Sequence, residues 1–383
     1  MSVSIPSHAN HVMLRWARET ANLSVEEVAA AEKIESNTIR QWENGEGSPT
    51  LAVLRKLSGR YKRPLQVFYL PQPQQGFTIV KDLRTIGGTV NRDFPSDLKI
   101  AIRKCQERQA WASEYLQELG FEPVDYLGSL SINASPENSA KKLRDRLGVN
   151  IDEVESESSD PRERLWMWRD AIERTGVFVW QVSKIDVTEM RGFALLDKYA
   201  PVIAINAQDS YTARLFSLIH ELGHLLLGQT ALSDAAVGQK IPDQSKIERF
   251  CNRLAAETLM PTDDFRRCIP ANWRSLADSV IGDLAKRYGV SPEAVLIRLV
   301  ELDYADQKYA DSKRKKFDKP GQQSGGPKQW IKMIANNGKS FSRLVISAYE
   351  GETVHGGQLT DLLGMKLKHL AQASHRLYPL KAS

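Results

Sequence analysis

Two histidines four residues apart, within an apolar stretch, place the strongest constraint on how this chain can fold. His220 and His224 lie in the run 215–227, where most other residues are apolar. Residues four apart face the same side of a helix, so the sequence predicts a buried helix that presents both imidazoles together. Glu221 follows the first histidine directly. Because two imidazoles on one helix face can bind one metal ion, the sequence predicts a metal site on this helix.

The spacing H-E-x-x-H is typical of zinc peptidases, in which the glutamate takes a proton from a water molecule at the metal. We therefore expect Zn²⁺ as the cofactor, His220 and His224 as metal ligands, and Glu221 as the catalytic base. One alternative is a pair of hydrogen-bonded histidines in the core of a helix. Another is a site that binds metal without catalytic turnover.

A catalytic zinc site normally uses three protein ligands. The downstream glycine and histidine of longer zinc motifs are absent, so we expect a carboxylate from the next predicted helix, 245–259. Glu248 and Glu257 are the candidates, nine residues apart. That spacing is about two and a half turns, so the two side chains face opposite sides and only one can reach the metal. Glu257 could instead pair with an arginine such as Arg253.

Bulk properties favour a multidomain protein that does not span a membrane. A chain of 383 residues with 42% hydrophobic residues has room for about two to three domains. It has no apolar run of about 18 residues and no signal-peptide pattern at its start. Its three cysteines are widely spaced, which argues against a disulfide framework. We expect a cytoplasmic protein with no membrane partner.

The pattern of predicted elements indicates a mainly α-helical chain with a small β-sheet, an α+β class. Strand-like runs at 177–182, 192–196 and 201–206 come directly before the metal-motif helix, 210–227. A polar loop is expected at 229–244. The net charge is +5, and basic residues gather in 311–319. Nucleic acid is one partner for such a segment, and a solvated linker is the other interpretation.

Two blocks of sequence resemble the ImmA/IrrE family of metallopeptidases. They are Arg214–Gly228, which contains the histidine motif, and Ile247–Pro261. In that family the second block reads E-x-x-A-N-x-F-A-A-x-L-L-M-P, and its first glutamate is the third zinc ligand, which implies Glu248. The chain departs from the pattern at Cys251, usually alanine, and at Leu254, usually phenylalanine. Known members cleave transcriptional repressors of the helix-turn-helix type, which implies a repressor as the protein substrate.

The N-terminal segments 23–29 and 34–45 resemble the Cro/cI-like (XRE) helix-turn-helix. Ser24 and Glu27 predict a capping box at the start of one helix, and Gly45 is expected to adopt a positive φ. The expected core residues are Val25, Val28, Ala29, Ile34, Ile39 and Trp42. The expected recognition helix is 36–43, and its candidate DNA-binding residues are Ser36, Asn37, Thr38, Arg40 and Gln41.

The resemblances imply a five-part organisation. Its parts are a five-helix helix-turn-helix domain (1–72), a helical connecting region (73–165), a zincin-like peptidase domain (166–305), a basic, glycine-rich linker (306–327) and a small helical C-terminal unit (328–383). They imply a DNA-binding transcriptional regulator fused to a zinc endopeptidase that cleaves a repressor-type protein, with a homodimer on palindromic DNA as the expected assembly.

Three other functions stay open at this point. In the first, the chain is an antitoxin-like or stress-responsive regulator, with a toxin as one partner, whose peptidase fold is a sensor without turnover. In the second, the N-terminal domain has kept its fold but binds protein instead of DNA. In the third, the whole chain is a structural scaffold, and absence of any bound metal would favour that interpretation.

Overall fold

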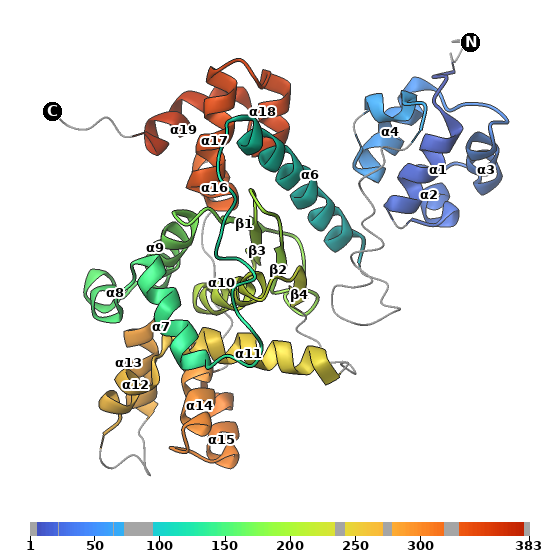
Figure 1. Cartoon of the computed structure of the whole chain (residues 1–383). Helices are drawn as coiled ribbons and strands as arrows, with labels where there is room; N and C mark the ends of the chain where they lie inside the picture. Colours follow the sequence, from blue (N-terminus) through green and yellow to red (C-terminus); the bar gives the residue numbers. More distant parts are fainter. Residues whose placement is uncertain are drawn as a thin grey trace. The chain divides into compact units, whose positions relative to one another are not determined.

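The computed structural model describes residues 6–21, 23–63, 65–72, 95–233, 242–270, 278–317 and 329–378. They form two compact units, the first ending at Gln106 within helix α6 (Ser96–Glu118) and the second beginning at Glu107. The architecture is mainly helical with one small sheet (Figure 1). The predicted α+β class is therefore confirmed. No helix of the described residues has the length and apolar character needed to cross a membrane.

The first unit begins with a bundle of short helices (Figure 1). In chain order these are α1 (His11–Thr20), α2 (Val25–Glu32), α3 (Ser36–Asn44), α4 (Leu51–Tyr61) and the 3-10 helix η1 (Leu65–Tyr69). The Ser24 side chain accepts a hydrogen bond from the Glu27 backbone while Glu27 bonds back to the backbone of Ser24, so the predicted capping box is present. Gly45 ends α3 at φ +83°, the backbone conformation that glycine adopts without strain.

The core of this bundle agrees in part with the expected one. Val28, Ala29 and Ile39 are buried, together with residues of α1 and α4. The other three expected core residues, Val25, Ile34 and Trp42, are only partly buried against it. The helix periodicity identified the inward faces but could not show how deeply each residue lies.

A four-stranded sheet organises the second unit. Its strands are β1 (Phe178–Val182), β2 (Gly192–Leu195), β3 (Val202–Asn206) and β4 (Ala231–Ser233), in the spatial order β1-β3-β2-β4. β1 runs parallel to β3, and β2 runs antiparallel to both of its neighbours. The first three strands were predicted. The fourth lies in the segment expected to be a loop, where three residues are too few to give a periodic signal.

Helix α10 (Tyr211–Leu226) packs against β2 and β3, and α11 (Pro242–Leu259) packs against α10 (Figure 1). Every residue of β2 and β3 is buried, as expected for strands covered by other elements. Helix α7 (Pro136–Leu147) packs along α11 in turn. The helix that carries the histidine motif is therefore held between the sheet and a second helical layer.

Further helices surround this core. They are α8 (Ile151–Glu157), α9 (Pro161–Glu173), α12 (Thr262–Cys268), α13 (Asp278–Tyr288), α14 (Pro292–Glu301) and α15 (Gln307–Phe317). Helix α15 occupies the first half of the segment expected to be a linker and packs against α14. It is ordered there because Ala310 is buried in the core of the unit, with Tyr309 packed beside it. Residues 318–328 of that segment lie outside the described residues.

The C-terminal helices pack on the β1 side of the sheet. They are α16 (Gln329–Asn337), α17 (Lys339–Glu350), α18 (Gly356–Leu363), the 3-10 helix η3 (Leu367–His369) and α19 (Leu370–Leu377). The Phe341 ring lies 5.0 Å from that of Trp180, 5.6 Å from that of Phe178 and 5.9 Å from that of Trp111, in edge-to-face arrangements. Such contacts join α17 directly to the sheet.

Candidate metal centre

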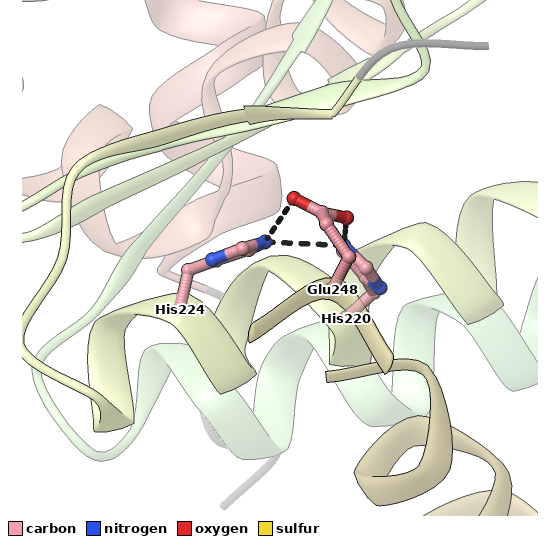
Figure 2. Close-up of side chains that lie close together, drawn as sticks. All are labelled: His220, His224 and Glu248. Atoms are coloured by element: carbon pink, nitrogen blue, oxygen red, sulfur yellow. Dashed lines mark hydrogen bonds and ion pairs between the residues drawn. The ribbon is translucent and has the colours of Figure 1, made fainter. Parts of the chain in front are cut away.

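Two buried imidazoles project from neighbouring turns of α10. Ser210 caps the helix by accepting a hydrogen bond from the Ala213 backbone. His220 and His224 are 6% and 1% exposed, and their Nε2 atoms lie 3.1 Å apart. The expected arrangement of both rings on one helix face is present (Figure 2). The short distance between the two Nε2 atoms shows that both rings turn the same nitrogen toward a common point.

The carboxylate of Glu248, on α11, meets the two rings (Figure 2). One of its oxygens lies 3.3 Å from Nε2 of His220 and the other 3.6 Å from Nε2 of His224. These three residues are the group of potential metal ligands that the described part of the chain brings together. Of the two glutamates considered from the sequence, the structure places Glu248 and not Glu257 at the histidines.

The spacing of these three groups fits a small tetrahedral ion. Ligand atoms about 2.1 Å from a tetrahedral zinc ion lie about 3.4 Å from one another. The shortest separations between the three side chains, 3.1, 3.3 and 3.6 Å, are near that value, and the last two are measured to different oxygens of Glu248. With one ligand atom taken from each residue, the three atoms lie within 4.8 Å of one another. Two imidazoles and one carboxylate also match the ligand set of catalytic zinc sites, which leave the fourth position open. The residues present therefore fit a zinc ion.

A fourth side chain fixes the orientation of His220. The Nδ1 atom of His220 lies 3.0 Å from Oδ1 of Asn252. Because an amide oxygen only accepts hydrogen bonds, Nδ1 carries a proton, and Nε2 is the ring atom that the neutral imidazole can offer to a metal ion. Asn252 was not among the residues predicted from the sequence. It lies four residues after Glu248, one turn along the same helix face, so the helical spacing was the available signal.

The electrostatics at His220 also follow from these neighbours. Burial lowers the pKa of the His220 imidazole, but its hydrogen bond with Glu248 and the charges of Glu221 and Glu248 raise it, and the net effect is a raised pKa. Burial likewise raises the pKa of the nearby Cys251 thiol, which keeps that sulfur protonated and less nucleophilic.

A small residue on α10 permits the close approach of α11. A Cβ added at Gly223 would lie 3.2 Å from Sγ and 3.4 Å from Cβ of Cys251. The two helices therefore approach each other closely at Gly223 and Cys251. A larger side chain at either of these two positions would push the helices apart. The departure from the family pattern at Cys251 places a slightly larger atom against a glycine that can accommodate it.

Glu221 points to the sheet side of the helix. It is fully buried, and its Oε1 would lie 2.9 Å from a Cβ built at Gly192 on β2. The expected base therefore lies between α10 and the first residue of β2. Nothing in the sequence motif indicated which strand would face it.

Glu257 has a different role from Glu248. It forms a buried ion pair with Arg298 of α14, and it accepts hydrogen bonds from the backbone and hydroxyl of Thr262 at 3.2 and 2.6 Å. An arginine partner for Glu257 was expected and is present, but the example given, Arg253, was wrong, because Arg253 lies 3.8 Å from Glu137 of α7. Sequence spacing could not identify Arg298, which lies 41 residues away.

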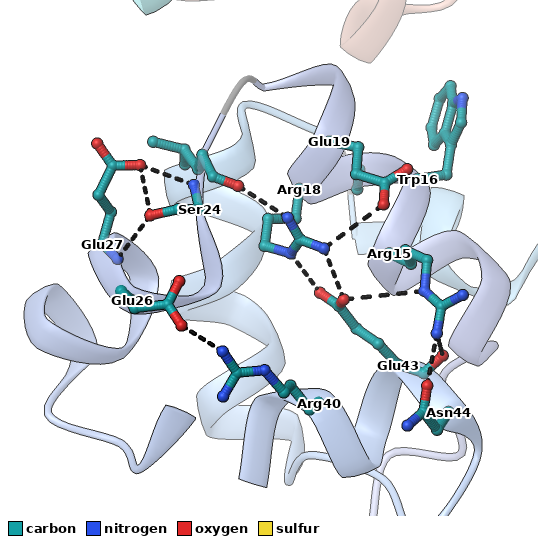
Figure 3. A network of polar contacts seen from close by, with 12 residues as sticks. Arg15, Trp16, Arg18, Glu19, Ser24, Glu26, Glu27, Arg40, Glu43 and Asn44 are labelled. Carbon is teal, nitrogen blue, oxygen red and sulfur yellow. Dashed lines mark hydrogen bonds and ion pairs between the residues drawn. The ribbon is translucent and has the colours of Figure 1, made fainter. Parts of the chain in front are cut away.

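The candidate DNA-binding residues lie on and beside the outer face of α3. Asn37, Arg40 and Gln41 are exposed, while Ser36 and Thr38 are half-buried. Arg40 forms an ion pair with Glu26 of α2 (Figure 3). The five residues share one short helix, and those that are exposed are accessible to a ligand in the isolated unit.

Glu43, at the other end of α3, holds the bundle together. It is 4% exposed, and the Arg18 guanidinium grips both of its oxygens at 2.7 and 2.8 Å (Figure 3). This two-point contact ties α3 to α1 and raises the pKa of Arg18, chiefly through the hydrogen bond to Glu43. Glu43 therefore has a structural role in the bundle.

Comparison with known protein families defines two domains. The IrrE N-terminal-like domain, a peptidase family, matches residues 176–300, and a helix-turn-helix family matches residues 14–68. No curated protein matches the chain. The first match contains all three potential metal ligands and Glu221, and the second contains α3.

The chain therefore belongs to the class of proteins that combine a helix-turn-helix domain with a metallopeptidase-type domain. More closely, the chain has an ImmA/IrrE-type domain behind an N-terminal XRE-type helix-turn-helix, as the sequence predicted. The two matches support a DNA-binding regulator joined to a peptidase-like domain.

Proposed function

We propose that this chain is a zinc-dependent endopeptidase that cleaves a helix-turn-helix repressor and that its N-terminal domain binds DNA. The observation that carries the proposal is the convergence of His220, His224 and Glu248 at separations that suit one zinc ion. The three residues come from two helices, and both histidines and the neighbouring Glu221 are buried. The alternative of two hydrogen-bonded histidines in the core of a helix does not require both Nε2 atoms and a carboxylate from a second helix to meet at one place.

His220, His224 and Glu248 would hold the ion. When bound, zinc supplies a Lewis acid that lowers the pKa of a water molecule to about 7 and polarises a carbonyl group. Glu221 would accept a proton from the attacking water molecule and would pass it to the nitrogen of the leaving amine. Asn252 holds the His220 ring in the tautomer that binds metal.

The repressor substrate is inferred from the family resemblance. The DNA-binding domain adds a physical reason, because a domain that binds the operator raises the local concentration of the peptidase near a repressor bound there. The described residues do not define a sequence preference for cleavage, so the substrate is assigned as a protein class.

A cleavage assay tests this proposal. Zinc-loaded protein is incubated with helix-turn-helix repressors encoded beside its own gene, with and without a chelator. We expect cleavage that the chelator stops and that Glu221→Gln abolishes while the variant keeps its zinc. Glu122→Gln, at an exposed position, is the matched control and should cleave normally. Cleavage that persists in Glu221→Gln would contradict the assigned role of the base.

The second candidate, a regulator whose peptidase fold does not turn over, predicts a different result. The wild type and Glu221→Gln would then bind operator DNA and repress equally well in cells, and neither would cleave any of the repressors. The exposed face of α3 supports DNA binding under both functions, since Asn37 and Arg40 can read adenine and guanine edges.

A further inference from the structure

Gly192 begins β2 at a position where glycine is not required by the backbone. Its φ lies outside the left-handed region that favours glycine. The residue pairs with Ile205 of β3 on one side and with Ser233 of β4 on the other. Glycine weakens a strand because it loses more conformational entropy on folding and has no side chain to pack. The reason for glycine here must therefore be space.

The space that a side chain would need is occupied by Glu221. A Cβ added to Gly192 would lie 2.9 Å from Oε1 and 3.0 Å from Cγ of Glu221, and 3.3 Å from the backbone oxygen of Ala204. Contacts of about 3.0 Å to a carbon atom require one of the two groups to move. Glu221 is fully buried, so its side chain has no solvent-filled space to move into.

We propose that Gly192 is a positioning residue for Glu221: the side chain it lacks leaves the volume in which the Glu221 carboxylate lies. Any larger residue displaces that carboxylate from its place beside the His220 and His224 pair. This inference rests on the proposed function in one respect, because the catalytic consequence depends on Glu221 being the base. The steric relationship does not depend on catalysis.

A double-mutant cycle tests the steric relationship without any activity. Gly192→Ala, Glu221→Ala and the double variant are compared with wild type by thermal unfolding of the zinc-loaded protein. We expect Gly192→Ala to lower Tm by at least about 2 °C when Glu221 is present. The same substitution should have a smaller effect, or raise Tm, when Glu221 is alanine, because the atoms it clashes with are gone.

A purely structural role in the strand would produce the same Tm change in both backgrounds, and that result would overturn the proposal. Gly282→Ala is the control: a Cβ there has no neighbour within 4 Å among the described residues. It lies inside helix α13, so we expect a small rise in Tm in both backgrounds. If Gly192→Ala does not fold, recovery of folding in the double variant supports the proposal. If neither Gly192→Ala nor the double variant folds, the clash is with the backbone of Ala204 and the proposal is overturned.

Measuring zinc binding and cleavage kinetics of Gly192→Ala separates this inference from the proposed function. We expect Gly192→Ala to bind zinc as wild type does, with kcat lowered at least about tenfold and KM little changed, because the base is misplaced while the ligands are intact. A wild type without cleavage would defeat the proposed function but leave the Tm coupling as a valid test. An active wild type with an equally active Gly192→Ala would overturn the positioning role.

Discussion

The side-chain oxygen of Asn252 accepts a hydrogen bond from Nδ1 of His220 across 3.0 Å. Asn252 and Glu248 belong to the same helix, α11, so one element supplies both a proposed metal ligand and the group that orients a second proposed ligand, His220. Partners of this kind fix the tautomer of a metal-binding histidine and sharpen its direction. The packing of α11 on α10 therefore determines the geometry of the whole candidate site.

Replacing Asn252 should weaken metal binding without unfolding the protein. Loss of the amide oxygen leaves the His220 ring free to rotate and to change tautomer, and substitutions of this kind typically lower affinity by about 10–100-fold. We expect that loss in Asn252→Ala and much less in Asn252→Asp, which keeps an acceptor. The zinc affinity of each variant is measured by competition with a chromophoric chelator. The control is Asn138→Ala, at an exposed site on α7, and an affinity for Asn252→Ala equal to that of the control would refute the prediction.

Breaking the buried Glu257–Arg298 pair should destabilise the protein near the C-terminal end of α11. Both side chains are at most 5% exposed, so removing either partner leaves an uncompensated buried charge. We expect Arg298→Ala to lower the free energy of unfolding by about 3–5 kcal/mol. The exposed pair Arg253–Glu137 provides the comparison, since Arg253→Ala should cost less than about 1 kcal/mol. Denaturant titration measures both, and equal losses would contradict this explanation.

The C-terminal helices should unfold together with the sheet. Glu173 of α9 accepts backbone hydrogen bonds from Lys339 and Ser340 at 3.0 Å each, at the first turn of α17. Together with the aromatic contacts of Phe341, these bonds make α17 part of the peptidase core.

We expect Phe341→Ala to lower stability by about 3–5 kcal/mol and to change the fluorescence of Trp111 and Trp180, whose rings it contacts. The control is Tyr378→Ala, at a ring that is 44% exposed, and it should have a small effect. Separate unfolding transitions for the two parts in wild type would show that the C-terminal helices fold independently.

The sequence predicted the elements that carry the site better than the contacts between them. His220, Glu221 and His224 followed from one motif on one helix, where spacing alone determines the face. The selection of Glu248 over Glu257 needed the family pattern, because spacing showed only that they point in opposite directions. Gly192 and Arg298 could not be found in this way, since their partners lie 29 and 41 residues away in the sequence and meet them only in the folded chain.

The ion pair between Glu26 and Arg40 should oppose DNA binding. Both side chains are more than half exposed, at 62% and 52%, and the Arg40 guanidinium must leave the carboxylate before it can contact a base. Glu26→Gln removes that competition and a negative charge near the phosphates, so we expect a severalfold gain in affinity. Arg40→Ala should cost about 1–3 kcal/mol on a specific operator.

Fluorescence anisotropy at fixed salt measures both DNA affinities. Glu32→Gln, which removes the partner of Arg60 on α4, controls for the change in net charge. Equal gains in Glu26→Gln and Glu32→Gln would show that charge, and not the release of Arg40, is responsible.

Zinc content per chain tests the central claim most directly. Freshly purified wild type, Glu248→Gln, His224→Ala and the control His369→Ala are dialysed against buffered Zn²⁺ and analysed for metal. We predict one zinc per chain in wild type and in His369→Ala, and loss of nearly all zinc in the two variants that remove a ligand. A wild type that takes up no zinc, or full occupancy in Glu248→Gln and His224→Ala, would contradict the assignment of this site.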